Sequence, residues 1–138
     1  MSILVDHGSR DRYVSVVGAY LLSTVICALF GAVYELFSHE VYSYYMIYAF
    51  AFPLLLGAAP FFILLKAGMP FHESAADLIH SGVAALTAGS ILKGILTIYG
   101  TSNTLIAVHW VLGAALTSAG WTAMFLSARS VRADSPLT

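Results

Sequence analysis

Charged residues are scarce in this chain. Aspartate, glutamate, lysine and arginine make up 9% of its 138 residues, whereas 59% of the residues are hydrophobic. A soluble domain carries about 25% charged residues, and a domain of this size buries only about two-thirds of its chain surface on folding. A soluble fold would therefore leave too much apolar surface in water. The composition predicts an integral membrane protein with one domain, residues 1–138.

Cysteine and runs of basic residues are also nearly absent. Cys27 is the only cysteine, which excludes an intrachain disulfide, a CxxC metal site and a CxxCH haem attachment. The net charge is −1 with the histidines neutral, and no basic cluster offers a surface to nucleic acid. The sequence has no phosphate-binding loop, HExxH motif or nucleophile–base motif. We therefore expect no nucleic-acid partner, no resident metal or cofactor, and no catalytic activity.

Four long apolar segments fill most of the chain, at about residues 13–37, 41–66, 74–99 and 104–128. Each has about 25 residues, which as a helix reaches about 37 Å, enough to cross a hydrocarbon layer of about 30 Å. Short connections place successive helices antiparallel. The sequence therefore predicts an all-α, up-down-up-down bundle of four transmembrane helices. The first segment exceeds the roughly 7–15 residues of a signal-peptide core, so we expect it to be retained.

Lysine and arginine are distributed unevenly between the two expected sides. With the N-terminus inside, five basic residues lie on the inner side: Arg10, Arg12, Lys66, Arg129 and Arg132. The outer loops contain none, and basic loops stay in the cytoplasm. We therefore expect a multi-pass protein of the plasma (inner) membrane, with short tails 1–12 and 129–138 that are both cytoplasmic.

Prolines and small residues predict how the segments pack. Pro53 and Pro60 each remove a backbone donor, so the second helix should be kinked or locally opened, either as ordinary membrane prolines or as a hinge. Stripes of small residues allow helices to approach closely, and three are present: Ser81, Ala85 and Gly89; Ala115 and Ala119; Gly113 and Thr117. We expect them to pack inside the bundle, with oligomerisation as the alternative.

Ionisable residues within apolar segments are candidates for function, because a charge at the centre of a membrane helix costs at least about 2.5–3.5 kcal/mol. Glu35, Lys93 and His109 fall in the outer parts of their segments, and His39 lies in the adjoining loop. We predict one polar cluster of these four residues at the outer mouth. It is a ligand-binding site in one interpretation and a structural Glu35–Lys93 ion pair in another. Separate snorkelling of each side chain to water is the third.

Asp77 and His80 form a possible second site near the inner side. They lie three residues apart, so they share one face of a helix, which is either a hydrated patch or an inner binding site. Binding of haem b is an alternative function for the histidines. His109 is outer and His80 inner, so their depths do not match, and the same-side pairs are His39 with His109 and His72 with His80. Metal binding by His39, Glu40 and His109 is another alternative.

These features favour a membrane protein without catalytic activity that binds or translocates a small solute or ion, alone, as a homo-oligomer, or as a subunit of a larger transporter. A structural or accessory subunit without its own ligand is the first alternative. A b-haem or quinone redox protein is the second. The lipid bilayer is the partner that the composition itself requires.

Overall fold

The computed structural model describes the backbone of residues 2–134 and the side chains of residues 7–134. Within this range the chain is helical and has no strand. Its elements are α1 (Ser2–Phe37), α2 (Tyr44–Ile47), the π-helix η1 (Pro53–Ala58), α3 (Ala59–Ala67), α4 (Glu73–Ile98) and α5 (Ile106–Ala133). Three helices of the described chain are long and apolar enough to cross a membrane, over His7–Phe37, Glu73–Ile98 and Ile106–Ala133.

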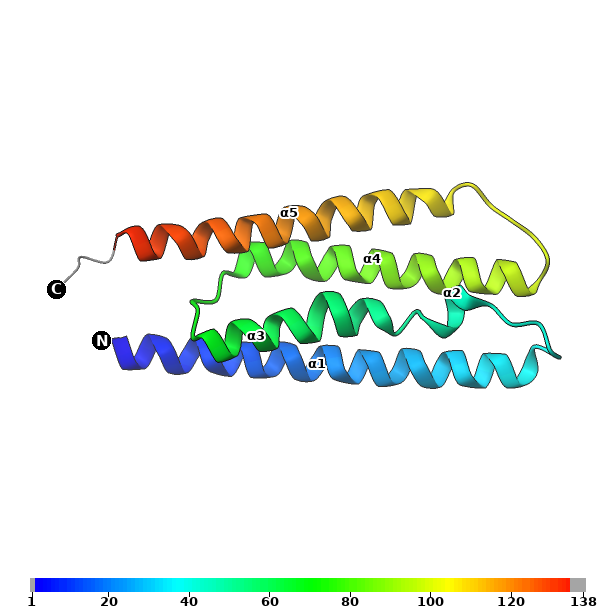
Figure 1. Cartoon of the computed structure of the whole chain (residues 1–138), viewed down its shortest axis with the longest axis horizontal. Helices are drawn as coiled ribbons and strands as arrows, with labels where there is room; N and C mark the ends of the chain where they lie inside the picture. The colour runs from blue at the N-terminus through cyan, green and yellow to red at the C-terminus, as the bar shows by residue number, and fades with distance from the viewer. Residues whose placement is uncertain (1, 135–138) are drawn as a thin grey trace.

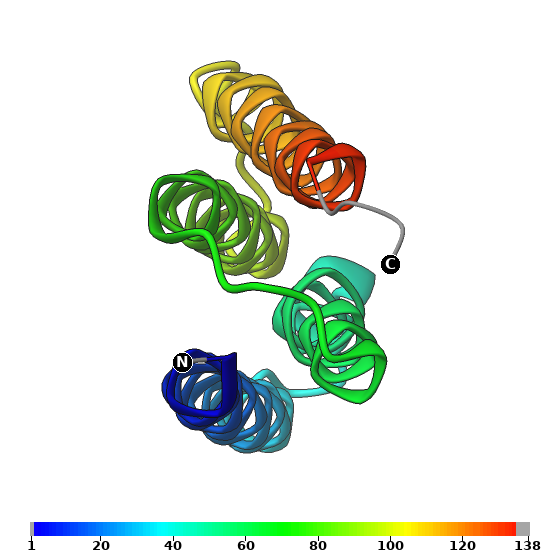
Figure 2. The same ribbon diagram turned by 90° about the vertical axis from the view of Figure 1, so that its left-hand side faces the viewer.

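The helices run back and forth along one long axis (Figure 1). We call the end where α1 begins and α5 ends the inner end, and the opposite end, which holds α2, the outer end. Seen along the axis, α5 lies beside α4, and α1 lies beside α3 at the other side of the molecule (Figure 2). The backbone of α5 packs mainly on α4, whereas α1 packs on η1 and α3. The segment from α2 to α3 therefore separates α1 from the pair formed by α4 and α5.

Two helices extend beyond the apolar segments that predicted them. α1 begins at Ser2 rather than near residue 13, and α5 ends at Ala133 rather than near residue 128, so residues 2–12 and 129–133 of the expected tails are helical. Residues 1 and 135–138 of those tails lie outside the described part of the chain. Hydrophobicity indicates how deep a segment sits in lipid, not where its hydrogen bonding ends. No proline interrupts either extension, and Gly8 costs a helix only about 1 kcal/mol.

The segment 41–66 is not one helix, which corrects the prediction of a continuous second transmembrane helix. α2 has four residues, turns follow at residues 48–50, and the chain is helical again from Ala51. A proline ring clashes with the carbonyl four residues back, which for Pro53 is that of Ala49, inside these turns. Pro60 follows η1, and the wider turn of a π-helix gives its ring room. The predicted local opening is confirmed, and the unbroken apolar helix is only Pro53–Ala67.

Small residues form the seam between α4 and α5. A Cβ atom on Gly82 would overlap the Thr117 hydroxyl and lie 2.9 Å from the Gly113 carbonyl oxygen. A Cβ atom on Gly89 would lie 2.8 Å from the Cβ atom of His109. The predicted packing is therefore confirmed for Gly89, Gly113 and Thr117, which are buried. Other members of the predicted stripes are exposed in this chain: Ser81, Ala115 and Ala119.

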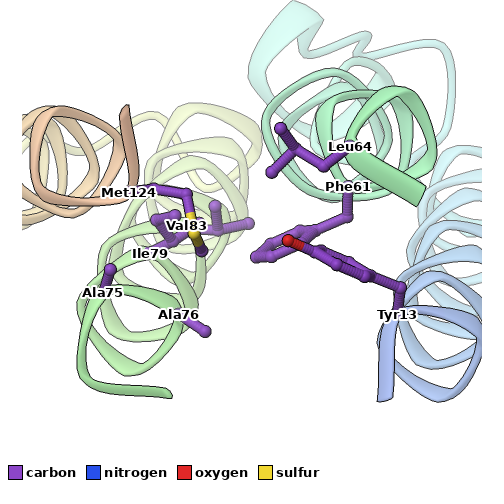
Figure 3. Close-up of a cluster of buried hydrophobic side chains, with 8 residues drawn as sticks. All are labelled: Tyr13, Phe61, Leu64, Ala75, Ala76, Ile79, Val83 and Met124. Atoms are coloured by element: carbon purple, nitrogen blue, oxygen red, sulfur yellow. The ribbon is translucent and has the colours of Figure 1, made fainter. Parts of the chain in front are cut away.

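The buried apolar core lies at the inner end (Figure 3). It draws on four helices, and its members are Tyr13, Phe61, Leu64, Ala75, Ala76, Ile79, Val83 and Met124. The Phe61 ring lies 5.1–6.4 Å from the rings of Tyr13, Phe71 and Trp121, measured between centroids. Packing of this kind, rather than the hydrophobic effect, holds helices together in lipid. The core therefore fixes the inner end of the molecule.

The turn between α3 and α4 is tied to α1. α3 ends at Gly68, whose φ of 64° is the left-handed conformation that commonly closes a helix. The Tyr13 hydroxyl donates to the Pro70 carbonyl oxygen at 3.1 Å, and Arg12 forms an ion pair with Glu73. Because of these two contacts, the inner halves of α1 and α4 keep a fixed separation.

Candidate functional site

A groove of about 570 Å³ runs between α1 and α4, and Pro53 of η1 also lines it. On α1 its lining extends from Val16 to Cys27, and on α4 from His80 to Ile91, which is about 16 Å of each helix at 1.5 Å per residue. The groove forms because both helices pack on the second segment rather than on each other. The groove therefore results directly from the position of the segment from α2 to α3 between α1 and α4.

The inner part of the groove holds a hydrogen-bonded pair from helices that are distant in sequence. The hydroxyl oxygen of Tyr20 lies 2.5 Å from Nδ1 of His80. Phe61 supports both rings, because its centroid lies 5.8 Å from that of Tyr20 and 5.6 Å from that of His80. Gly57 leaves room for the ring of Tyr20, since a Cβ atom at this position would overlap that ring. The inner core therefore positions this pair.

Other hydroxyl groups in the groove are already bound to their own helices. Ser23 donates to the carbonyl oxygen of Ala19 at 2.9 Å, and Thr87 donates to that of Val83 at 2.8 Å. Such bonds to the carbonyl four residues back are a common way for helices to satisfy serine and threonine. The Tyr20–His80 pair is therefore the main polar feature of a lining that is otherwise apolar apart from the weakly polar Cys27 thiol.

A polar pocket of about 320 Å³ lies on the inner side of His80, which lines both this pocket and the groove. Asp77 also lines the pocket, so the structure brings together the two residues predicted for the inner site. Arg12, Ser15 and Glu73 complete its polar lining. His80 thus stands between an apolar groove along the helices and a charged pocket at the inner end.

Sequence reasoning missed Tyr20 as a partner of His80. The available signal was a tyrosine in the middle of an apolar segment, because a buried tyrosine hydroxyl usually finds a hydrogen-bond partner. The sequence did not indicate which partner, since Tyr20 and His80 are 60 residues apart. Gly57 was missed for the same reason, because nothing near it in sequence indicates that an aromatic ring from α1 lies against it.

The structure separates Glu35 from Lys93, which corrects the predicted ion pair. α2 lies between α1 and α4 at the outer end. Met46 of α2 is clamped there, because Cβ atoms built on Gly31 and Gly94 would lie 3.0 Å from its carbonyl oxygen and 2.9 Å from its Cβ atom, respectively. Glu35 and Lys93 therefore lie on opposite sides of α2, a separate short helix that the prediction of a continuous second helix did not include.

Each member of the predicted pair has a different neighbour. Oε1 of Glu35 accepts a hydrogen bond from the backbone N–H of Ser43 at 3.1 Å, which fixes the chain just before α2. The Nζ atom of Lys93 lies 5.8 Å from the ring centroid of Tyr45. Glu35 therefore orders the loop that leads into α2, while Lys93 faces the other side of α2.

The two histidines predicted for the outer cluster are also apart. His39 is exposed in the loop, and its Nδ1 lies 2.9 Å from the carbonyl oxygen of Phe37. His109 packs over Gly89 in the seam, and its Nδ1 is buried without a hydrogen-bond partner among the described residues. No hydrogen bond or ion pair links Glu35, His39, Lys93 and His109 to one another within the described chain.

His80 and His109 lie at different levels along the seam between α4 and α5, as the sequence predicts. His109 lies against Gly89, and His80 precedes Gly89 by nine residues, which places it about 13 Å further along α4. Within the described chain, no three histidine, cysteine, aspartate or glutamate side chains are grouped closely enough to hold a metal ion. The alternative site at His39, Glu40 and His109 is therefore not assembled.

Comparisons of the chain with models of protein families, with curated proteins and with solved structures find no match. No relative therefore suggests a ligand or a reaction. The groove with its Tyr20–His80 pair is therefore the feature of the described chain that bears most directly on function.

Proposed function

We propose that this protein crosses a membrane and binds a small lipid-soluble molecule in the groove between α1 and α4. Three helices have the length and composition to cross, and the segment from α2 to α3 supplies the remaining pass. The five basic residues predicted for the inner side belong to the inner parts of α1, α3 and α5, which meet at one end (Figure 1). Such an end stays in the cytoplasm.

The groove is open to the surrounding lipid along its length. Ala19 and Ser23 on one wall, and Ala84 and Ala88 on the other, line the groove and are exposed. Small side chains at these positions keep the groove wide enough for a chain or a ring. A molecule that is dissolved in the bilayer therefore reaches the groove sideways, without passing through water.

The Tyr20–His80 hydrogen bond is the observation that supports our choice of ligand class. When the tyrosine hydroxyl donates to Nδ1, a neutral His80 carries its proton on Nε2. That N–H makes no hydrogen bond to any described residue, so it is free to donate. His80 lines both the groove and the polar pocket, and we propose that this N–H faces the groove. A donor there favours a ligand with a carbonyl oxygen at one end and an apolar tail. A quinone belongs to this class.

Cys27 lines the groove and is the only cysteine, so its alkylation reports occupancy. We would measure the rate at which N-ethylmaleimide modifies Cys27 in detergent-solubilised protein, with 2-dodecanone or dodecane added. The ketone carries the carbonyl group and the alkane does not. We expect the ketone to slow alkylation at roughly five- to tenfold lower concentration than the alkane, since one hydrogen bond is worth about 1–1.5 kcal/mol.

Variants identify the part of the groove that is responsible. His80→Phe keeps the ring but removes the donor, so the ketone and the alkane should then act alike. Ala84→Trp should fill the groove and abolish protection by both molecules. Ala114→Trp places the same side chain on an exposed position of α5, outside the groove lining, and should leave protection unchanged. Equal action of ketone and alkane on the parent protein would contradict the proposal.

A further inference from the structure

A second cavity, of about 540 Å³, lies at the outer end between Tyr45 and the start of α5, and Lys93 lines it. Trp110 lies on its wall near Tyr45, with ring centroids 6.2 Å apart. The remaining polar residues of the lining are three consecutive ones: Ser102, Asn103 and Thr104. This cavity is separate from the groove, because no residue lines both.

Lys93 has no counter-charge in the part of the chain that the structure describes. The ion pair found there joins Arg12 to Glu73 at the other end, and Glu35 is bound to Ser43 across α2. The contact of Lys93 with the Tyr45 ring is worth only about 0.5–1 kcal/mol at an exposed site. A contact of this size leaves the charge without a strong partner. An anion from outside the chain would supply the missing partner.

The rest of the lining also suits an anion. Oδ1 of Asn103 accepts a hydrogen bond from the backbone N–H of Leu105 at 2.9 Å, which leaves the side-chain amide N–H groups to donate. The hydroxyl groups of Ser102 and Thr104 make no hydrogen bond to other described residues. No carboxylate lines the cavity. The lining thus offers one positive charge and several donors beside two aromatic rings.

We propose that this outer cavity binds an anionic group, a phosphate or a carboxylate, attached to an apolar body that lies against Tyr45 and Trp110. The ammonium of Lys93 provides the charge, and a hydrogen bond between charged groups is about twice as strong as a neutral one. The position of the cavity at the outer membrane surface rests on the proposed membrane crossing. The set of hydrogen-bond donors that line the cavity does not depend on that crossing. The anion comes either from a lipid headgroup or from a soluble solute.

Trp110 provides a direct measurement, because Trp121 is the only other tryptophan and Trp121→Phe leaves Trp110 as the sole reporter. We would titrate this variant in nonionic detergent with dihexanoyl phosphatidylglycerol, dihexanoyl phosphatidylcholine and inorganic phosphate, and follow the tryptophan emission. We expect a saturating response to phosphatidylglycerol at roughly tenfold lower concentration than to phosphatidylcholine. A response to inorganic phosphate at similar concentrations would assign the anion to a soluble source.

Lysine variants test whether Lys93 causes the difference. Lys93→Met should remove the preference for the anionic ligand, and Lys93→Arg should retain it. Lys66 is a matched control, because its ammonium also lies over a ring, 5.5 Å from the Phe62 centroid, but at the inner end. Lys66→Met should keep the preference. A parent protein that responds to neither anion, or a Lys93→Met variant that responds as the parent does, would overturn the proposal. Cys27 reports on the groove independently.

Discussion

Phe61 at the inner end contacts aromatic rings from α1, α4, α5 and the turn before α4, whereas Met46 at the outer end fits between the backbones of two helices. The inner end is held by large interlocking side chains. The outer end is held by the close approach of a four-residue helix to Gly31 and Gly94. This difference shows that one small helical domain can hold its two ends together in different ways, by interlocking rings at one end and by close backbone approach at the other.

Polar groups follow the same division. At the inner end the polar side chains of Tyr13, Tyr20 and Arg12 all have partners. Three of the four buried side-chain atoms that lack a partner in the described chain lie toward the outer end, on Glu35, Ser43 and His109. Two non-glycine residues there, at positions 39 and 40, also have positive φ angles of 52° and 69°, each costing about 1–2 kcal/mol. Unpaired polar groups and backbone strain therefore gather at the outer end of the described chain.

The largest expected contrast between the two ends is their accessibility from outside the cell. With Cys27→Ser as background, a cysteine at Ser102 should react in intact cells with a thiol reagent that does not cross membranes. A cysteine at Ser130, on the inner side, should react only after the cells are opened, because basic segments remain in the cytoplasm. Both positions are exposed in the structure. Labelling of Ser130 but not Ser102 in intact cells would reverse the two ends.

The next contrast is in stability. Phe61→Ala should lower the free energy of unfolding by about 3–5 kcal/mol, because it leaves a cavity in the inner core. Phe62 is its neighbour in sequence and is 47% exposed, so Phe62→Ala should cost less than about 1 kcal/mol. Unfolding in mixed micelles, followed by circular dichroism, measures both. Similar losses for the two variants would mean that the inner end does not depend on this core.

The smallest expected effect is the coupling between Glu35 and Lys93. Because α2 separates them, the losses of stability in Glu35→Gln and Lys93→Met should add to within about 0.5 kcal/mol in the double variant. Glu35→Gln keeps an oxygen that can accept the bond from the Ser43 backbone. The same unfolding assay applies. A coupling well above 1 kcal/mol would show that the two side chains meet, and the outer end would then be better paired than the structure indicates.

The helical segments were accessible from sequence because hydrophobicity and helix length are local properties. The predicted opening of the second segment followed from Pro53 and Pro60, which act on neighbouring backbone. Position along the long axis of the molecule also followed from residue counts, and this correctly separated His80 from His109. The helical extensions at both ends were missed because polar residues such as Arg12 and Arg129 continue a helix as readily as apolar ones.

The sequence did not show which helices lie side by side. Glu35 and Lys93 were placed at similar depths, but residue counts do not show that α2 lies between their helices. The Tyr20–His80 contact depends on Gly57 and Phe61, which belong to a third segment. A contact of this kind is specified by several distant residues together, so no local pattern contains it. For this reason the sequence identified His80 as a candidate but not the groove that it lines.

The short helix Pro53–Ala67 bears on the proposed membrane crossing, because its length limits the kind of bilayer that would suit the protein. Its 15 residues reach about 22 Å, less than the roughly 30 Å of an average hydrocarbon layer. Non-helical backbone at membrane depth is tolerated only where protein covers it or where it lines a water-filled space, and α1 and α4 cover α2 only in part. Hydrophobic mismatch of this kind sorts proteins between membranes of different thickness. A bilayer that is thinner beside the second segment would fit the chain better than a thick, sterol-rich bilayer.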